Sequence, residues 1–486
     1  MTGEKPLEFR IGILGAFIAP LVFLIGATAH FVYFRAFDMT ALTMSAIVGL
    51  LLASMLAKNY HLFWDRAVAG LASPIAMTVV MILFVVGPFA SLLETTGISQ
   101  GFVWLASEMG VSSGLFIAVV FAATCAMSVS TGTSLGTMFT AFPIFYPAGA
   151  ALDANAVLLA GAIFSGAMFG DNLAPISDTT VVSSSTQKYR SREGTAEVAG
   201  VVASRLKYSL TTAGICFVLF LVFGYVFPGA GLQSDIDASG ASPQGLIMIV
   251  PVIALITVAF WKRNLFLAIT VGLVVGIVTG MASGLLNLNS IVSVEDGAPV
   301  GFIFDGVNGM LPLIGLTLGV FGMMGVLRGA GIFDLIIEKL SNARWSRGPR
   351  GAEIAIGAGQ TATTTLFAGV VGPSIVTFGP VADELGARAG LHPYRRANVM
   401  ECFGMGLACM VPAFSAFLFI ISQLTEGHEG MPALAPMEVA VAAFYPIVLF
   451  LVMTISVITG WGRVFEGEDG TPTKTHTLSQ PESITA

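Results

Sequence analysis

The amino-acid sequence predicts an all-α polytopic membrane protein built from two inverted-topology repeats that contain broken helices or re-entrant hairpins. Composition is the first reason, because only 10% of the 486 residues are charged and 55% are hydrophobic, whereas soluble proteins carry about 25% charged residues. The second is a mean hydropathy of +0.86, with several apolar runs longer than the roughly 18 residues that mark a transmembrane helix. The third is a sequence repeat between the two halves.

Apolar runs divide the chain into fourteen expected spans, two of which are broken. They cover residues 11–33, 39–57, 73–94, 111–130, 133–151, 154–180 (broken), 205–228, 244–260, 264–285, 310–328, 351–368, 370–387, 396–422 (broken) and 437–461. The pairs 111–151 and 351–387 are short and contain glycine and proline, so each pair either crosses the membrane or forms a re-entrant hairpin. The prediction is therefore about 10–14 transmembrane segments.

The second half of the chain repeats the first at an offset of 230 residues (361 − 131 = 230). At this offset Thr131-Gly-Thr133-Ser matches Thr361-Ala-Thr363-Thr, and Asp171 matches Glu401. Each half holds an odd number of spans, so the second half would enter from the opposite side. That is the inverted repeat of many secondary transporters, in which the site lies where the repeats meet.

These patterns predict a domain order and an orientation. The expected order is a cytoplasmic N-terminus at 1–10, a first repeat at 11–228, a linker at 229–243, a second repeat at 244–462 and a disordered cytoplasmic tail at 463–486. With the N-terminus inside, Arg35 is the only one of the 22 basic residues that falls outside the cytoplasmic segments. Because cytoplasmic loops are enriched in Lys and Arg, both termini are expected to be cytoplasmic.

One stretch places polar chemistry inside an apolar run. Asp171, Pro175 and Asp178 follow an apolar segment that begins at residue 154. Proline removes a backbone donor, and such a break survives in a membrane only where it lines protein or a polar cavity. A charged side chain at that depth indicates a functional site. Carboxylates, freed carbonyls and hydroxyls are hard oxygen ligands, which suit a small cation or a proton and indicate a transporter.

Further side chains are candidates for the same ion or substrate site. They are the hydroxyls Ser177, Thr179, Thr180, Thr131, Thr133, Ser134, Thr361 and Thr363, and the carboxylate Glu401. Asp171 and Asp178 would bind the cation directly. Structural alternatives remain open, because Asp178 also suits the cap of a second half-helix and small hydroxyl residues also allow close helix packing. Glu401 could instead be an interfacial residue paired with Arg395 or Arg396.

The sequence also argues against other classes of protein. It contains no GxxxxGK[ST], no HExxH and no soluble segment large enough for an ATPase. We therefore expect no enzyme, no catalytic residues, no cofactor and no nucleic-acid partner. The expected partners are the lipid bilayer and a transported small cation and proton, or a small organic substrate; oligomeric state is left open, a homodimer included.

Two motifs resemble those of a known family. Residues 170–180 read Gly170-Asp171-Asn-Leu-Ala-Pro175-Ile-Ser177-Asp178-Thr179-Thr180, and residues 131–137 read Thr131-Gly-Thr-Ser-Leu-Gly-Thr137. They resemble the GD-x-x-(S)P-x-SDTT signature and the TGTSWGT element of the NhaC family of Na+/H+ antiporters, with Leu135 where the family usually has Trp. In the second half the family tends to have an ED-x-G-T stretch and a Pro-Trp pair, whereas this chain has Met400-Glu401-Cys402 and Pro412-Ala413.

The resemblance implies exchange of cytoplasmic Na+ for external H+ in a bacterial inner membrane. We expect Na+ and H+ to compete for the region of Asp171 and Asp178, with alternating access to the two sides. Relatives with similar motifs exchange organic acids or amino acids, so the alternative is a coupled carrier of a small organic acid or amino acid. Its counter-charge would then be Arg328 or Arg395.

Overall fold

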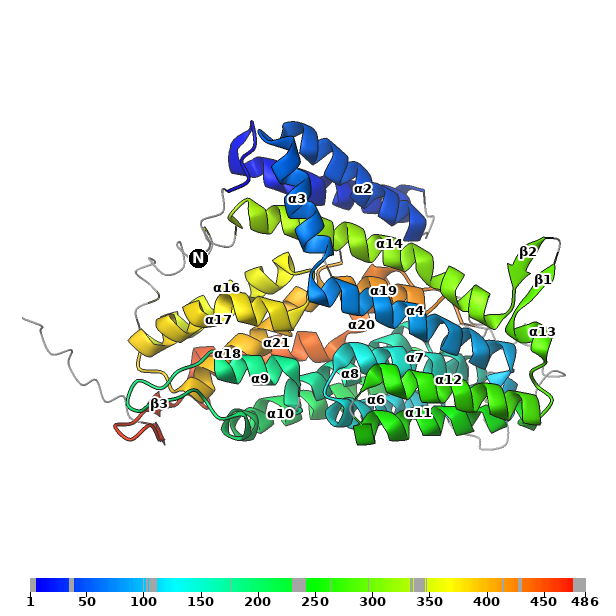
Figure 1. The fold of residues 1–486 in the computed structure, drawn as a ribbon. Helices are drawn as coiled ribbons and strands as arrows, with labels where there is room; N and C mark the ends of the chain where they lie inside the picture. Colours follow the sequence, from blue (N-terminus) through cyan, green and yellow to red (C-terminus); the bar gives the residue numbers. More distant parts are fainter. Residues whose placement is uncertain are drawn as a thin grey trace, which may run out of the picture.

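The computed structural model describes most of the chain and shows an almost entirely helical protein (Figure 1). The described residues are 6–34, 39–98, 100–101, 104, 112–175, 177–229, 242–262, 264–295, 297–332, 335, 346, 348–412, 415–426 and 431–474. Most of the predicted linker, 230–241, and the end of the tail, 475–486, lie outside these ranges.

The first half consists of helices joined by short connections. It comprises η1 (Gly12–Phe17), α1 (Ile18–Thr28), η2 (Ala29–Tyr33), α2 (Met39–Leu56), α3 (Tyr60–Leu71), α4 (Pro74–Thr95), α6 (Ser113–Thr131), α7 (Ser134–Ala151), α8 (Ala156–Leu173), α9 (Asp178–Ser185) and α10 (Val198–Val226). All the spans predicted in this half are found as helices, and α8 and α9 form the predicted broken helix. Helix α3 is an addition, since its residues were expected to be a loop.

The second half repeats this order of elements. It comprises η5 (Pro243–Met248), α11 (Ile249–Lys262), α12 (Leu265–Ala282), α13 (Leu288–Ile291), the hairpin β1 (Ser293–Glu295) and β2 (Ala298–Val300), α14 (Phe302–Gly329), α16 (Pro349–Leu366), α17 (Val371–Arg388), α18 (Pro393–Gly404), η7 (Leu407–Met410), α19 (Ala416–Leu424), α20 (Pro436–Ala442), α21 (Phe444–Thr459), β3 (Phe465–Glu466) and β4 (Pro472–Thr473). The second predicted broken helix is α18, η7 and α19.

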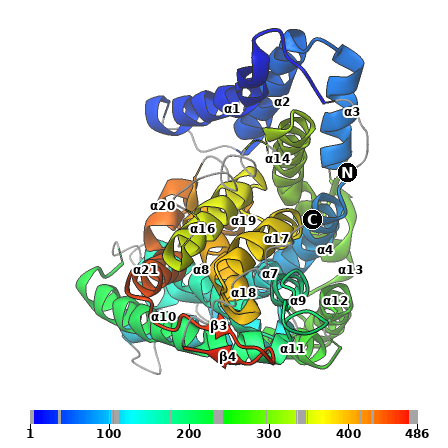
Figure 2. The same cartoon turned by 90° about the vertical axis from the view of Figure 1, so that its left-hand side faces the viewer.

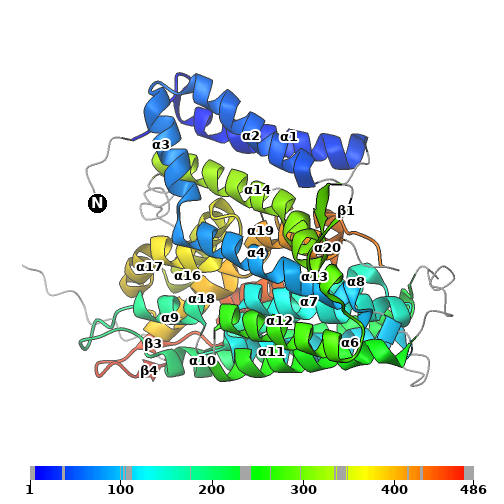
Figure 3. The same ribbon diagram turned by 45° about the vertical axis from the view of Figure 1, so that its right-hand side comes forward.

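The two halves exchange neighbours in a symmetrical way. Helix α2 of the first half packs on α14 of the second, and α12 of the second half packs on α4 of the first (Figures 1 and 3). Likewise α9 packs on α17 and α18 of the other half, while α19 packs on α7. The second piece of each broken helix therefore lies against the hairpin of the opposite half (Figure 2).

Small residues bring helix backbones close together where the halves meet. A Cβ atom added to Gly87 of α4 would lie 2.2 Å from the carbonyl oxygen of Gly306 in α14. Within the first half, one added to Gly170 of α8 would lie 2.3 Å from the Ser128 backbone of α6. Lipid offers no hydrophobic drive for helix association, so close packing through small residues is a main source of stability.

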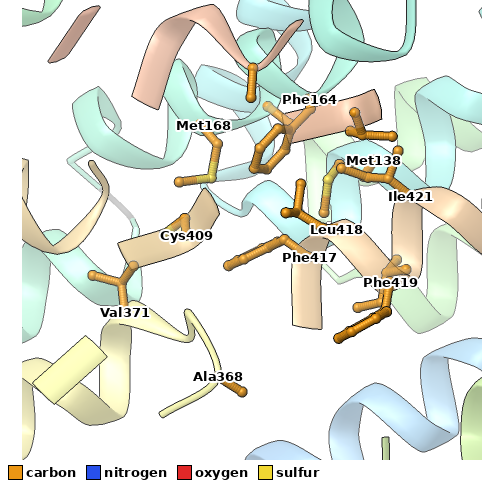
Figure 4. Packing of buried hydrophobic residues seen from close by; sticks show 14 of the residues in the cluster. Met138, Phe164, Met168, Ala368, Val371, Cys409, Phe417, Leu418, Phe419 and Ile421 are labelled. Atoms are coloured by element: carbon orange, nitrogen blue, oxygen red, sulfur yellow. The ribbon is translucent and has the colours of Figure 1, made fainter. Parts of the chain in front are cut away.

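An apolar core fills the space between α7, α8, α19 and the turn of the second hairpin (Figure 4). Phe164 of α8 and Phe417 of α19 lie with ring centroids 5.9 Å apart, and Cys409 of η7 lies beside them in the same cluster. This core separates the α1–α3 and α14 side of the molecule from the polar site described below.

By length and composition, five helices of the described part could cross a membrane, or six if α20 and α21, bent by 51°, count as one. They are Ala76–Thr95, Ser113–Thr131, Ala156–Ser185, Val198–Val226 and Phe302–Gly329. Four shorter apolar helices are Gly12–Gly26, Thr40–Leu56, Pro243–Val258 and Phe266–Ala282. Of the two predicted hairpins, α6 is among the long apolar helices, whereas α7, α16 and α17 are not.

The repeat register differs from the predicted one at the hairpins. Helix α8 ends at Leu173 and α18 at Gly404, an offset of 231 (404 − 173) that agrees with the pairing of Asp171 and Glu401. Helices α7 and α17, however, begin at Ser134 and Val371, an offset of 237 (371 − 134). Helices α6 and α16 end at Thr131 and Leu366, an offset of 235 (366 − 131), so Thr361 and Thr363 lie inside α16 rather than at the turn.

The first part of the tail is ordered, which corrects the prediction that disorder begins at residue 463. Strands β3 and β4 form a small antiparallel hairpin, and Phe465 forms a β-bridge with Leu391. The Glu466 carboxylate accepts hydrogen bonds from the backbone N–H groups of Arg190 and Ser191. These long-range contacts supply the order that the polar composition of the segment does not predict.

Candidate functional site

The break between α8 and α9 is made by local sequence. The Ala174 N–H still donates to Gly170 O, and the Ser177 N–H donates to Ala174 O, so the chain makes one turn before α9 begins at Asp178. Pro175 lies in this turn and has no N–H to continue the helix. Pro175 is exposed, whereas Ala174 and Ser177 in the same turn are buried.

Asp171 lies in the last turn of α8, two residues before the break, and is 6% exposed. Ser134 Oγ, at the start of α7, donates to Asp171 Oδ2 over 2.7 Å. Ser177 Oγ, from the break itself, donates to Asp171 Oδ1 over 2.5 Å. Within the described part of the chain, Asp171 has no basic side chain within ion-pair distance. Its charge is thus met by hydroxyl groups alone.

Asp178 differs from Asp171 in both exposure and role. It is the first residue of α9 rather than its cap, because Ser177 occupies the capping position and gives its hydroxyl to Asp171. Asp178 is exposed, and its Oδ1 accepts from the Thr179 N–H over 2.9 Å. Gly372 of α17 lies opposite, where an added Cβ would come within 3.2 Å of Asp178 Oδ2.

Glu401 is fully buried and bound by α9 and α10 of the opposite half. Ser183 Oγ donates to its Oε2 over 2.5 Å. Thr179 and Thr180 Oγ1 lie 3.3 and 3.2 Å from its Oε1. Glu401, which the sequence repeat pairs with Asp171, therefore also lies near it. Thr179 Oγ1 is within hydrogen-bond distance both of Glu401 Oε1 and of Ser177 Oγ, which binds Asp171.

The cation that neutralises Glu401 is Arg205, which the sequence analysis assigned to a cytoplasmic segment. Arg205 Nη1 lies 2.5 Å from Glu401 Oε1, and both side chains are 0% exposed. The interfacial alternative, with Arg395 or Arg396 as partner of Glu401, is wrong. Helix α10 begins at Val198 rather than at 205, so Arg205 lies two turns inside a long apolar helix. The sequence signal that could have predicted this ion pair was the position of Arg205 at the very start of the predicted span 205–228.

Arg395 and Arg396 bind other buried carboxylates. Arg395 Nε donates to Glu353 Oε1 over 2.7 Å, and Arg463 binds the second oxygen of the same carboxylate. Arg396 Nη1 donates to Asp383 Oδ1 over 2.7 Å. Burying a charge is costly unless it is paired, and these pairs join α16, α17 and α18 to the ordered part of the tail.

A polar cluster around Asn172 was not predicted. The Asn172 carbonyl accepts from Arg205 Nη1 over 2.5 Å, and its side-chain Oδ1 accepts from Ser209 and Tyr445 over 2.7 and 3.1 Å. Asn172 Nδ2 is buried without a hydrogen-bond partner. The cluster links α8 to α10 and α21 directly behind Asp171.

The other predicted hydroxyls have local partners. Thr131 Oγ1 lies 2.9 Å from Thr137 Oγ1, and Thr133 Oγ1 accepts from the Gly136 N–H over 3.4 Å. In the second half Thr361 donates to Phe403 O and Thr363 to Gly359 O. The structure thus brings Ser134, Ser177, Thr179 and Thr180 to the two carboxylates but leaves these four threonines in the hairpins.

The chemistry of this site is that of oxygen ligands. The described residues hold no group of three or more His, Cys, Asp and Glu side chains that could bind a metal ion. The oxygens gathered at Asp171 are those of its own carboxylate and of the Ser134 and Ser177 hydroxyls. Hydroxyls suit both states of such a site, because they donate to an ionised carboxylate and offer lone pairs to a cation.

Part of the chain is similar to known antiporters. Residues 6–225 match the model of the Na+/H+ antiporter family. The chain is 27% identical over 307 residues to the malate-2H+/Na+-lactate antiporter of Bacillus subtilis (strain 168), covering 62% of this chain and 63% of that protein. It is 33% identical over 157 residues to a Haemophilus influenzae protein described as an uncharacterized Na+/H+ antiporter, covering 31% of this chain and 32% of that protein.

Among solved structures, the chain is similar to MtrF of Neisseria gonorrhoeae, described as one of a class of antimetabolite efflux pumps, with 13% identity and a TM-score of 0.37. That similarity covers 86% of this chain and 94% of that one. The matched regions span less than two thirds of the length of the two sequence relatives. The family match over residues 6–225 contains the break, Asp171 and Arg205.

Proposed function

We propose that this chain is a secondary active transporter of a bacterial inner membrane that exchanges Na+ for H+ at Asp171. The observation that carries the proposal is a buried carboxylate at a helix break, bound by the hydroxyls of Ser134 and Ser177 and by no basic side chain of the described residues. A carboxylate in such surroundings favours either a proton or a cation as its partner. The family match and the relative described as an uncharacterized Na+/H+ antiporter support the same interpretation.

Exchange would follow from competition at one site. With H+ bound, the Asp171 carboxyl is neutral and remains hydrogen-bonded to Ser134 and Ser177. With Na+ bound, the same oxygens turn lone pairs toward the cation, and Asp178 adds negative charge at the start of α9. Since one site cannot hold both ions, movement of Na+ one way requires movement of H+ the other way.

Alternating access would use the contact between the two halves. Glu401 and Arg205 form a neutral pair that joins α18 to α10 across the repeat boundary. Discontinuous helices at such a boundary are the usual place for an ion site in secondary transporters. The segments rich in Lys and Arg, including both termini, are assigned to the cytoplasmic side on the positive-inside rule.

The test uses proteoliposomes that contain the purified protein and an internal pH dye. Addition of Na+ outside acid-loaded vesicles is expected to raise the internal pH, and Asp171→Asn is expected to abolish the response while the protein remains folded and inserted. Glu384→Gln is the matched control, since Glu384 is an exposed carboxylate paired with Arg388 away from the site. Sodium-dependent proton movement that persists in Asp171→Asn would contradict the proposal.

A second candidate function is exchange of a small organic acid, which one relative favours by its description as a malate-2H+/Na+-lactate antiporter. Arg395 is bound to Glu353, so the exposed Arg328 at the end of α14 is the better candidate for a counter-charge. In the same vesicles, a response to an organic acid with none to Na+ alone would select this function. Arg328→Gln would then reduce the apparent affinity for the acid.

A further inference from the structure

A chain of two hydroxyls connects the carboxylates of the two halves. Ser177 Oγ lies 2.5 Å from Asp171 Oδ1 and 2.8 Å from Thr179 Oγ1. Thr179 Oγ1 lies in turn 3.3 Å from Glu401 Oε1. All four side chains are buried, with exposed fractions of 6% or less. The connection therefore runs from α8 through the break and α9 to α18 without solvent.

Each hydroxyl has one hydrogen to donate, so only two hydrogens serve the three links while both carboxylates are ionised. When Asp171 is ionised, Ser177 donates to Asp171 and Thr179 donates either to Ser177 or to Glu401, so one link of the chain is always missing. When Asp171 is protonated, it can donate to Ser177, which then donates to Thr179, and Thr179 donates to Glu401. The Asp171 carbonyl, 3.4 Å from Thr179 Oγ1, is a longer alternative acceptor.

Glu401 is suited to respond to the orientation of the Thr179 hydroxyl hydrogen rather than to accept a proton. Its charge is neutralised by Arg205 at 2.5 Å, and it has donors besides Thr179, namely Thr180 and Ser183. Protonation of Glu401 would leave the buried Arg205 charge unpaired, which is unfavourable. No net proton transfer along the chain is required; only the hydroxyl hydrogens reorient.

Other charged or titratable groups face this site from the helices packed on α8. Asp178 of α9, Glu401 of α18 and Cys409 of η7 face Asp171. Arg205 of α10 and Tyr445 of α21 bind the adjacent Asn172. Glu438 of α20 accepts from the Ala435 N–H at the start of its own helix. Helices α6 and α7 contribute no charged side chain.

We propose that Ser177 and Thr179 are positioning residues that couple the protonation of Asp171 in the first half to the hydrogen bonding of Glu401 in the second. The inference rests on the proposed Na+/H+ exchange at Asp171 and adds the route by which the state of that site reaches the opposite repeat. Because the coupling is reciprocal, a change in the donors of Glu401 must change the pH at which Asp171 exchanges its proton.

The test is a double-mutant cycle on the pH midpoint of Na+-driven exchange. Ser183→Ala removes a donor from Glu401, so the Thr179 hydrogen bond becomes more valuable and the orientation that belongs to protonated Asp171 is favoured. The midpoint is expected to rise by about 0.5 pH unit. In the Thr179→Val background, where the chain is broken, the same Ser183→Ala change is expected to shift the midpoint by less than about 0.1 unit.

The controls separate the hydroxyl chain from general damage to α9. Ser184→Ala is the matched control, since Ser184 is buried one residue further along and donates to Thr180 O rather than to Glu401; it should leave the midpoint unchanged. Thr179→Ser keeps a hydroxyl and should restore the Ser183→Ala shift. If Thr179→Val does not fold, Ser177→Ala breaks the same chain and replaces it in the cycle.

The outcomes separate the inference from the proposed function. Exchange in the wild-type protein with an equal Ser183→Ala shift in both backgrounds overturns the coupling and leaves the antiport proposal standing. The same holds if Ser183→Ala produces no shift in the wild-type background. No Na+-dependent proton movement in the wild-type protein overturns the proposed function itself. A shift that disappears with Thr179→Val and returns with Thr179→Ser supports the coupling.

Discussion

Asp171 and Glu401 occupy matching positions at the ends of the first pieces of the two broken helices, yet their charges are balanced differently. Asp171 is met by two hydroxyls, whereas Glu401 is met by Arg205 as well as by hydroxyls. A carboxylate without a fixed cation can exchange its partner, while one bound to a buried guanidinium keeps its charge. The repeat thus supplies two similar positions with different partners, and we expect the first to be exchangeable and the second to be structural.

The largest expected effect on stability comes from replacing Arg205, the cation that distinguishes Glu401 from Asp171. Arg205→Met leaves the buried Glu401 charge unpaired and should destabilise the protein by about 3–5 kcal/mol. Adding Glu401→Gln should recover most of the loss, because the remaining polar group still has the donors Ser183 and Thr180. Thermal unfolding in detergent measures both variants; equal stability of Arg205→Met and wild type would refute the assignment of Glu401 as a permanently charged partner.

A smaller effect of opposite sign is expected at Asp171. Asp171→Asn removes an uncompensated buried charge while keeping the shape of the side chain, so the protein should be stabilised by about 1 kcal/mol at neutral pH even though exchange is lost. The same unfolding assay applies, with Glu384→Gln as the surface control. Destabilisation comparable with that of Arg205→Met would show that Asp171, too, is a structural charge.

The smallest effect is expected at Glu197, an exposed carboxylate just before α10. Burial acts to raise its pKa, but hydrogen bonds from Tyr189 and Tyr394 and the charge of Arg192 prevail and lower the pKa of Glu197 to about 2. Since the folded pKa is below the unfolded value of about 4.3, the stabilisation is complete above that pH and is lost as the pH falls toward 2. With a side chain 49% exposed, it is screened to below about 0.5 kcal/mol.

Glu197→Gln measures that contribution. The variant should unfold at a slightly lower temperature than wild type at pH 7, and the difference should shrink between about pH 5 and pH 3. A difference that grows on acidification would mean that the sign of the pKa shift is wrong. The result would also set an upper limit on the stability that the exposed cluster around Glu197 contributes, for comparison with Asp171 and Glu401.

Much of the fold could be predicted because it depends on local composition. Long apolar runs, glycine and proline locate the helices and both breaks, because these features act through the backbone and the lipid environment. Helices α10 and α14, however, begin 7 residues (205 − 198) and 8 residues (310 − 302) before their predicted spans. The predictions failed where contacts between segments that are distant in the sequence determine the structure. Residues 465–473 look like a disordered tail, yet they form a hairpin because Arg190, Ser191 and Leu391 provide partners for them.

The site was predicted in part for the same reason. Asp171, Ser177 and Thr179 belong to one short motif, so their proximity follows from the sequence. Thr361 and Thr363 were paired with Thr131 and Thr133 by a single offset, whereas α16 continues to Leu366 and keeps both residues within the helix. Asn172 has no distinctive sequence pattern, and only its burial and its contacts reveal it.

The sequence by itself determined that this chain lies in a membrane, where its helices run, and that a carboxylate sits at a break in each half. Those features depend on hydropathy and backbone chemistry, which act over a few neighbouring residues. Only the tertiary structure decided that Arg205 neutralises Glu401 across 196 residues of chain and that Ser134 reaches Asp171 across 37. Such partners are chosen by helix packing, which brings together side chains that no local pattern connects.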